Sequence, residues 1–162
     1  MASLAELEAR IAALEDIEAI KRLKYKYLRC LDTKQWDEMG TTFAPDATTD
    51  YSDGELKFSG RDAIMKFLKE SAMAGPAGLV GVHQVHHPEI ELTSPTTAKG
   101  TWALYNYLLH KTEHTGLRIC AYYHDEYVKT AGQWLIKSTG YRRIFEEHWD
   151  RNDTPSLKIV KA

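Results

Sequence analysis

The sequence lacks the features that would direct it to a membrane or to a nucleic acid. It has no run of the about 18 apolar residues that a membrane-spanning helix needs, and residues 1–10 have neither the basic start nor the apolar centre of a signal peptide. The 21 basic and 23 acidic side chains are interspersed, so no basic stripe could follow a phosphate backbone. We therefore expect a cytoplasmic protein without membrane or nucleic-acid partners.

Cysteine is also scarce. The two cysteines, Cys30 and Cys120, lie far apart in the sequence and form no CxxC pair. We therefore expect neither a disulfide nor a thiolate metal site, and the two residues are typical of small apolar side chains in a reducing compartment.

Histidine is clustered rather than scarce. Three of the seven histidines fall within GVHQVHHPEIEL, at residues 81–92. Pro88 and the β-rich sequence after it indicate a strand, in which His83 and His87 point to one face and His86 to the other. Such side chains cannot converge on one ion, so we expect no metal site here.

The first half of the chain has a helical pattern. Apolar residues recur every three or four positions from Ser3 to Asp32, which predicts a long amphipathic helix whose start is heptad-like. A short helix is expected over Trp36–Phe43, a hairpin at the Asp-Gly pair of YSDG, and a third helix over Gly60–Met73, followed by the loop GPAG at residues 75–78.

From Val82 to Phe145, β-branched and aromatic residues dominate, and turn sequences recur at regular intervals. This pattern predicts four long strands in a meander. Helices followed by one antiparallel sheet indicate an α+β fold, with three N-terminal helices packed on the concave face of a curved sheet. Residues 1–150 are expected to form one domain, and residues 151–162 a polar tail.

A pocket is expected inside the curve of the sheet. Alternation directs Trp102 and Asn106 inward on one strand, and Tyr123 and Asp125 inward on the next. At the inner end of the first helix, a buried Asp32 would need a positive or hydrogen-bonding partner, and a histidine so held is a suitable general base near neutral pH. From the residues alone, an exposed carboxylate and a structural histidine are the simpler interpretations.

A resemblance to a known family favours the catalytic interpretation of Asp32 and of a histidine partner. The segments DIEAIKRLKYKYLRCLDTKQWDEM, YSDGELKF, HQVHHPEI and GQWLIKSTGYRRIFEEHW resemble the bile acid 7α-dehydratases of the SnoaL-like family. That family shares a cystatin-like α+β cone with scytalone dehydratase, ketosteroid isomerase and the polyketide cyclases. The likeness covers the chain from about Asp16 to Asp150 and implies the same fold.

The resemblance also implies site residues. The catalytic Asp–His dyad of the family falls on Asp32 and His83, and its helix tyrosine falls on Tyr27. Tyr51 takes the place of a pocket tyrosine that polarises a carbonyl. Arg143 falls on the arginine of the family's GYxRIFEEH motif and is expected to bind a substrate carboxylate or to stabilise the enolate. Substrate contacts are further expected at three inward positions of the sheet: Trp102, Asn106 and Tyr123. Where the bile acid enzyme has an acidic residue, this chain has Asn106.

The function implied is that of a cofactor-free lyase. It would remove water from an alicyclic, including steroid-like, hydroxy ketone or enone through His–Asp acid–base catalysis. Two alternatives use the same cone: an isomerase or polyketide-cyclase-type enzyme with the same dyad, and a non-catalytic module that binds a small molecule.

The chain is also expected to assemble. The outward positions of the later strands are rich in apolar and aromatic side chains, which is typical of an interface. The resemblance to dehydratases implies a homotrimer, and a dimer is the alternative. The heptad-like start of the first helix is a competing interface.

Overall fold

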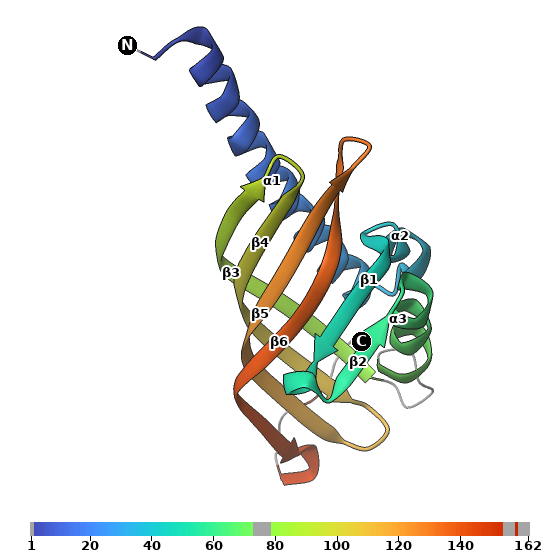
Figure 1. Ribbon diagram of the computed structural model, residues 1–162. Coiled ribbons are helices and arrows are strands. Elements are labelled where there is room, and N and C mark those ends of the chain that lie inside the picture. Colours follow the sequence, from blue (N-terminus) through green and yellow to red (C-terminus); the bar gives the residue numbers. More distant parts are fainter. Residues whose placement is uncertain (1, 73–78, 154–157, 159–162) are drawn as a thin grey trace.

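The computed structural model describes residues 2–72, 79–153 and 158, which form a curved six-stranded sheet with helices across its concave side (Figure 1). The strands lie side by side in the order β2-β1-β6-β5-β4-β3. In chain order the elements are α1 (Leu4–Asp32), α2 (Trp36–Gly40), β1 (Phe43–Tyr51), η1 (Ser52–Gly54), β2 (Leu56–Ser59), α3 (Arg61–Phe67), η2 (Leu68–Ala72), β3 (Leu79–Ser94), β4 (Thr97–His110), β5 (Thr115–Thr130), β6 (Gln133–Asp150) and η3 (Arg151–Asp153).

Helix α1 agrees with the predicted long helix. It starts with a capping box, in which the Ser3 hydroxyl accepts from the Glu6 backbone N–H at 3.2 Å and the Glu6 carboxylate accepts from the Ser3 N–H at 2.7 Å. Most apolar side chains of its second half are buried, and Asp32 is its last residue. The helix therefore delivers Asp32 to the inside of the cone.

The four predicted meander strands are present as β3 to β6. Inward and outward side chains alternate along β4 and β5, so that Asn106 and Tyr123 are buried, whereas Tyr105 and Tyr122 face outward and remain at least partly accessible. Antiparallel pairing places His83 of β3 directly opposite Asn106 of β4. This register brings polar side chains from neighbouring strands to the same part of the concave face.

The sheet is mixed, which corrects the expectation of a purely antiparallel sheet. Strand β1 pairs in parallel with β6, with Thr49 opposite Thr139 and Asp50 opposite Gly140. A Cβ atom at Gly140 would lie 2.4 Å from the backbone oxygen of Asp50, so this close approach requires glycine. The predicted hairpin at YSDG is present between β1 and β2, and this pairing attaches it to the same sheet.

Two expected helices have different bounds. Helix α2 ends at Gly40, and Phe43, which was assigned to that helix from sequence, begins β1. The reason is local, because Gly40 is a poor helix former and threonines and an aromatic residue follow it. The third helix begins at Arg61 and passes into a π-helical turn that ends at Ala72. Its expected last residue, Met73, and the loop at 75–78 lie outside the described residues.

The expected alternation of the histidine strand is wrong at one position. His83 is directed inward and His86 is exposed on the opposite face, but His87 is exposed as well. A β-bulge between His86 and Glu89, with a positive φ of 49° at His87, resets the alternation. No described helix has the length and apolar character to span a membrane.

Candidate active site

A cavity of about 130 Å³ lies on the concave side of the sheet, against the end of α1 and the β1–β2 hairpin. Its polar wall consists of one histidine, one asparagine and three tyrosines: His83, Asn106, Tyr51, Tyr123 and Tyr141. The remainder of the wall is aliphatic or aromatic and comes from helices and strands alike: Leu31, Leu56, Phe67, Leu68, Leu108 and Ile119. Such an apolar pocket with a few converging polar groups is typical of a small-molecule site.

Asp32 holds His83 by two contacts. Asp32 Oδ1 lies 2.5 Å from His83 Nδ1, and Asp32 Oδ2 accepts from the His83 backbone N–H at 3.0 Å. The histidine side chain is 7% exposed and that of the aspartate 20%. Because a carboxylate can only accept, Nδ1 carries the proton and Nε2 is left as the basic nitrogen. The predicted Asp32–His83 contact is therefore present, and its imidazole belongs to the cavity wall.

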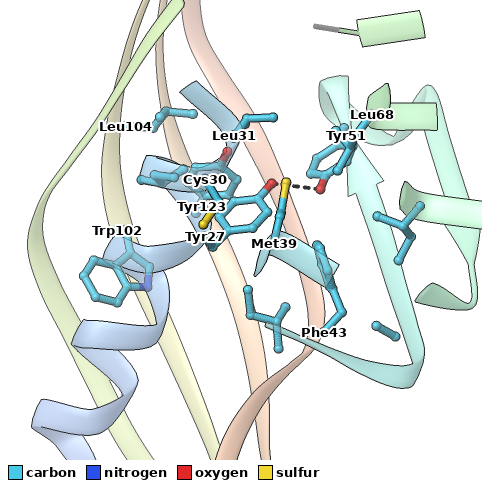
Figure 2. Packing of buried hydrophobic residues seen from close by; sticks show 14 of the residues in the cluster. Tyr27, Cys30, Leu31, Met39, Phe43, Tyr51, Leu68, Trp102, Leu104 and Tyr123 are labelled. Carbon is cyan, nitrogen blue, oxygen red and sulfur yellow. Dashed lines mark hydrogen bonds between the residues drawn. The ribbon is translucent and has the colours of Figure 1, made fainter. Parts of the chain in front are cut away.

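Tyr27 does not line the cavity itself and contacts the wall residue Tyr51. The two phenolic oxygens are 3.0 Å apart (Figure 2), and Tyr51 lies on the cavity wall whereas Tyr27 is packed behind it, 1% exposed. Burial raises the pKa of Tyr51, and neighbouring Tyr27 and Tyr123 raise it further, well above its usual value. Tyr51 is thus a neutral hydrogen-bond donor.

Asn106 is buried on the cavity wall with an unused acceptor. The residue is 3% exposed, and its Oδ1 has no hydrogen-bond partner among the described residues. A buried carbonyl oxygen without a partner is costly, on the order of 1–3 kcal/mol. Since Asn106 pairs with His83 across β3 and β4, this acceptor is available next to the imidazole to a donor group of a bound molecule.

Two of the sequence-predicted residues lie away from the cavity wall. Trp102 is fully buried, and its Nε1 donates to the Tyr127 hydroxyl at 2.9 Å. Arg143 lies beside η1, where its Nε donates to Asp53 at 2.6 Å and its Nη1 to Glu146 at 2.8 Å. The hydrogen bonds to Glu146 and Asp53 raise the pKa of Arg143 above its usual value. Its charge is therefore already balanced within the chain.

Sequence reasoning missed Tyr141 as a wall residue. Its ring lies 6.0 Å from that of Tyr51 and 5.7 Å from that of Tyr123, measured between centroids, and its hydroxyl is 3.0 Å from Ser52 Oγ. The signal was its position in GYRRIF, two residues before Arg143 and on the same face of a strand. Three tyrosines from three strands thus line one cavity.

A second charged pair lies behind the tyrosines and was also missed. Lys24 Nζ is 2.7 Å from Asp125 Oδ2, and both side chains are fully buried. The ammonium lies 3.4 Å from the centroid of the Tyr123 ring, which gives it a cation–π contact as well. Among the described residues, no group of three or more His, Cys, Asp or Glu could hold a metal ion.

The fold is shared with several solved structures. A protein from Novosphingobium aromaticivorans assigned to scytalone dehydratase is 23% identical, with a TM-score of 0.76 over 85% of this chain and 90% of that one. The hexachlorocyclohexane dehydrochlorinase LinA-type3 from Novosphingobium barchaimii is 16% identical, with a TM-score of 0.79 over 94% and 99%. An NTF2-like protein with a cystatin-like fold from N. aromaticivorans is 18% identical, with a TM-score of 0.70 over 89% and 92%.

The family follows from the sequence match. At these identities the solved structures establish the cystatin-like fold, and they leave the reaction open. The family model for the SnoaL-like domain matches residues 12–140, which is most of the chain and includes Asp32, Tyr51, His83 and Asn106. The chain belongs to the SnoaL-like family.

Proposed function

We propose that the protein is a cofactor-free dehydratase that acts on an alicyclic hydroxy ketone or enone. The observation that carries the proposal is the Asp32–His83 pair, with contacts of 2.5 and 3.0 Å, whose imidazole borders a cavity with otherwise uncharged walls. A histidine oriented in this way is suited to remove a proton from carbon at neutral pH. The names of two structural neighbours, a dehydratase and a dehydrochlorinase, support an elimination.

The proposed first step is the removal of a proton by Nε2 of His83. The proton leaves a carbon α or vinylogous to the carbonyl, and the C–H electron pair moves toward the carbonyl oxygen. Tyr51, backed by the Tyr27 hydroxyl at 3.0 Å, donates to that oxygen as it becomes an enolate. Donors fixed in advance in a dry cavity stabilise such developing charge strongly.

The proposed second step expels the hydroxyl group. The electron pair returns from the enolate to form the carbon–carbon double bond, the C–O bond breaks, and the imidazolium of His83 protonates the departing hydroxyl to water. Tyr27, which is packed behind Tyr51, does not reach the leaving group. Asn106 Oδ1, buried without a partner, accepts from the substrate hydroxyl and orients it near the histidine. Arg143 acts from outside the wall, since its ion pair with Asp53 ties β6 to the turn that follows Tyr51.

The cavity wall favours a neutral substrate. Apart from His83, its polar groups are the uncharged Asn106 and three tyrosines, and the others are apolar. A flat ring system with one carbonyl and one hydroxyl group matches such an uncharged wall with a few hydrogen-bonding groups. Steroid-like compounds are the larger substrates of this type. The neutral Asn106, where the bile acid enzyme has an acid, favours a substrate that needs an acceptor without a charge at this position.

Product analysis tests the proposal. The purified chain is incubated with a panel of alicyclic β-hydroxy ketones and hydroxy enones, including steroids, and the products are followed by mass and by the absorbance of a new conjugated system. We expect the loss of one water with at least one member. A product of unchanged mass would replace the lyase by an isomerase or cyclase, and binding without turnover would indicate a binding module.

We also propose that the outer face of the sheet joins copies of the chain as a trimer. Val82 on β3 is 51% exposed, and Tyr122 on β5 is 44% exposed. Apolar surface of this kind usually marks an interface. Light scattering should give three times the chain mass of 18.5 kDa, or six times that mass if a second interface pairs two trimers. A simple dimer would favour the isomerase instead.

A further inference from the structure

The first three turns of α1 carry an apolar stripe that none of the described residues covers. Leu4 is 74% exposed, Leu7 43%, Ile11 56% and Leu14 67%. This part of the helix extends beyond the end of the sheet (Figure 1). The helix meets the rest of the chain at Asp16, which accepts from Lys129 Nζ at 2.6 Å and from Trp134 Nε1 at 2.8 Å.

The spacing of the stripe is that of a coiled coil. The four residues are separated by three, four and three positions, so Leu4 and Ile11 occupy a positions of a heptad and Leu7 and Leu14 occupy d positions. About three free helical turns with no packed face would be marginal in water. We infer that this stripe packs against the same stripe of a second copy of the chain, with the two helices parallel and in register.

The charges beside the stripe select the partner and its direction. Arg10 occupies a g position, and Glu8 and Glu15 occupy e positions. Among the described residues, none of the three forms an ion pair within its own chain. In a parallel in-register pair, each Arg10 faces Glu15 of the second copy, so two opposite-charge pairs form about the two-fold axis.

The antiparallel arrangement is disfavoured by the same residues. It would bring Leu4 opposite Leu14 of the second copy and would place Arg10 opposite Arg10 and Glu8 opposite Glu8. Like charges in these positions are destabilising. Isoleucine at the central a position with leucine at both d positions further favours two strands. The sequence of the stripe is therefore complementary to itself in one direction only.

A cysteine cross-link tests the direction. In a parallel in-register pair, residue 14 faces residue 14, so Leu14→Cys should form a covalent dimer on mild oxidation at micromolar concentration. Ala9→Cys is the matched control, because Ala9 is exposed on the same helix and occupies the outward f position. The wild-type chain gives the background of Cys30 and Cys120. No dimer from Leu14→Cys beyond that from Ala9→Cys would overturn the inference.

Charge exchange tests the partner. In the Leu14→Cys background, Arg10→Glu converts two attractive pairs into repulsive ones and should slow disulfide formation about tenfold. The double change Arg10→Glu with Glu15→Arg restores the pairs and should restore the rate. An equal rate in all three proteins would overturn the inference, as would a trimer held by the sheet alone with no cross-link between helices.

Discussion

Helix α1 carries two charged residues, eight positions apart, that each pair with a residue on the sheet. The two pairs differ in their burial and in their access to the cavity. Lys24 pairs with Asp125 at 2.7 Å, with both side chains fully buried. Asp32 pairs with His83 at 2.5 Å, with side chains that are 20% and 7% exposed. The first pair is sealed in the core, and the second has its imidazole on the wall of the cavity.

The carboxylate of the sealed pair is fully occupied within the chain. The Asp125 carboxylate accepts from the Thr139 hydroxyl at 2.7 Å and from the Tyr127 hydroxyl at 2.7 Å, in addition to the ammonium. Burial lowers the pKa of Lys24, and the charge of Asp125 opposes this change. A carboxylate so fully occupied behind the cavity holds the tyrosines in place, whereas the base His83 remains available.

The largest effect on activity is expected from His83→Ala. The change removes the proposed base, and a positioned general base contributes on the order of 10²–10⁴-fold to a rate. Turnover of the substrate found in the product screen should fall by that factor, while the unfolding transition in urea stays close to that of the wild type. Retention of more than a tenth of the activity would exclude His83 as the base.

The sealed pair should show its effect on stability. Lys24→Met leaves Asp125 buried without its countercharge, and breaking a buried pair in this way costs about 3–5 kcal/mol. Adding Asp125→Asn should recover much of this loss, because the amide oxygen can still accept from Thr139. Urea unfolding, followed by tryptophan fluorescence, gives both values.

An exposed ion pair on the same helix is the control for this result. Arg22 and Glu18 are 78% and 51% exposed, so Arg22→Met should change the free energy of unfolding by less than about 1 kcal/mol. If Lys24→Met were as stable as Arg22→Met but inactive, the sealed pair would belong to the chemistry, and the distinction between the two pairs would fail.

Asp32→Asn should have an intermediate effect. The amide can still accept from the His83 backbone N–H, so the fold should persist, but the carboxylate that fixes the tautomer and stabilises the imidazolium is lost. We expect the rate to fall by about 10²-fold, the lower end of the 10²–10⁴-fold contribution that a general base makes. The rate at substrate saturation is the quantity to measure. A loss larger than that of His83→Ala would mean that Asp32 itself takes the proton.

The Asp32–His83 pair could be predicted from the sequence, and the reasons are local. A carboxylate at the inner end of an amphipathic helix needs a partner, strand alternation places His83 inward, and the family resemblance connects the two. The meander and the hairpin followed from turn residues and β-branched runs in the same way. What could not be predicted depends on contacts distant in sequence: the parallel pairing of β1 with β6, and the approach that Gly140 permits there.

The sealed pair left a signal that was not used. Asp125 lies on the inward face of β5 between Tyr123 and Tyr127, and Lys24 follows Ile20 by one helical turn on the buried side of α1. Two opposite charges at inward positions suggest that they meet, but sequence alone does not place a helix over a given strand. The bulge at His87 is likewise invisible, because a positive φ is uncommon for any residue other than glycine and no turn sequence marks it.

Tyr51→Phe should have a smaller effect than the dyad variants. Loss of a donor aimed at developing charge costs about 10²–10³-fold in other enzymes, and with two more tyrosines on the wall we expect about tenfold here. A phenol donates only while it is protonated, and burial raises the pKa of Tyr51, so the donor persists to higher pH. The ratio of wild-type to Tyr51→Phe rates should therefore stay constant up to about pH 10, the usual tyrosine pKa. A ratio that falls earlier would show an ionised Tyr51.

The smallest effect on the rate is expected from His86→Ala. This variant tests whether His83 is the one histidine of the cluster that takes part in the reaction. His86 is three residues from His83 and exposed on the opposite face of β3, and its ring is 6.0 Å from that of the equally exposed His87. It has neither a carboxylate partner nor a place on the cavity wall among the described residues. Surface substitutions of this kind change free energies by about 0.5 kcal/mol or less, so the rate should change less than about twofold. A loss comparable to that of His83→Ala would mean that the outer face of β3 takes part in the reaction. The contrast between the buried Lys24–Asp125 pair and the Asp32–His83 pair at the cavity would then no longer explain the site.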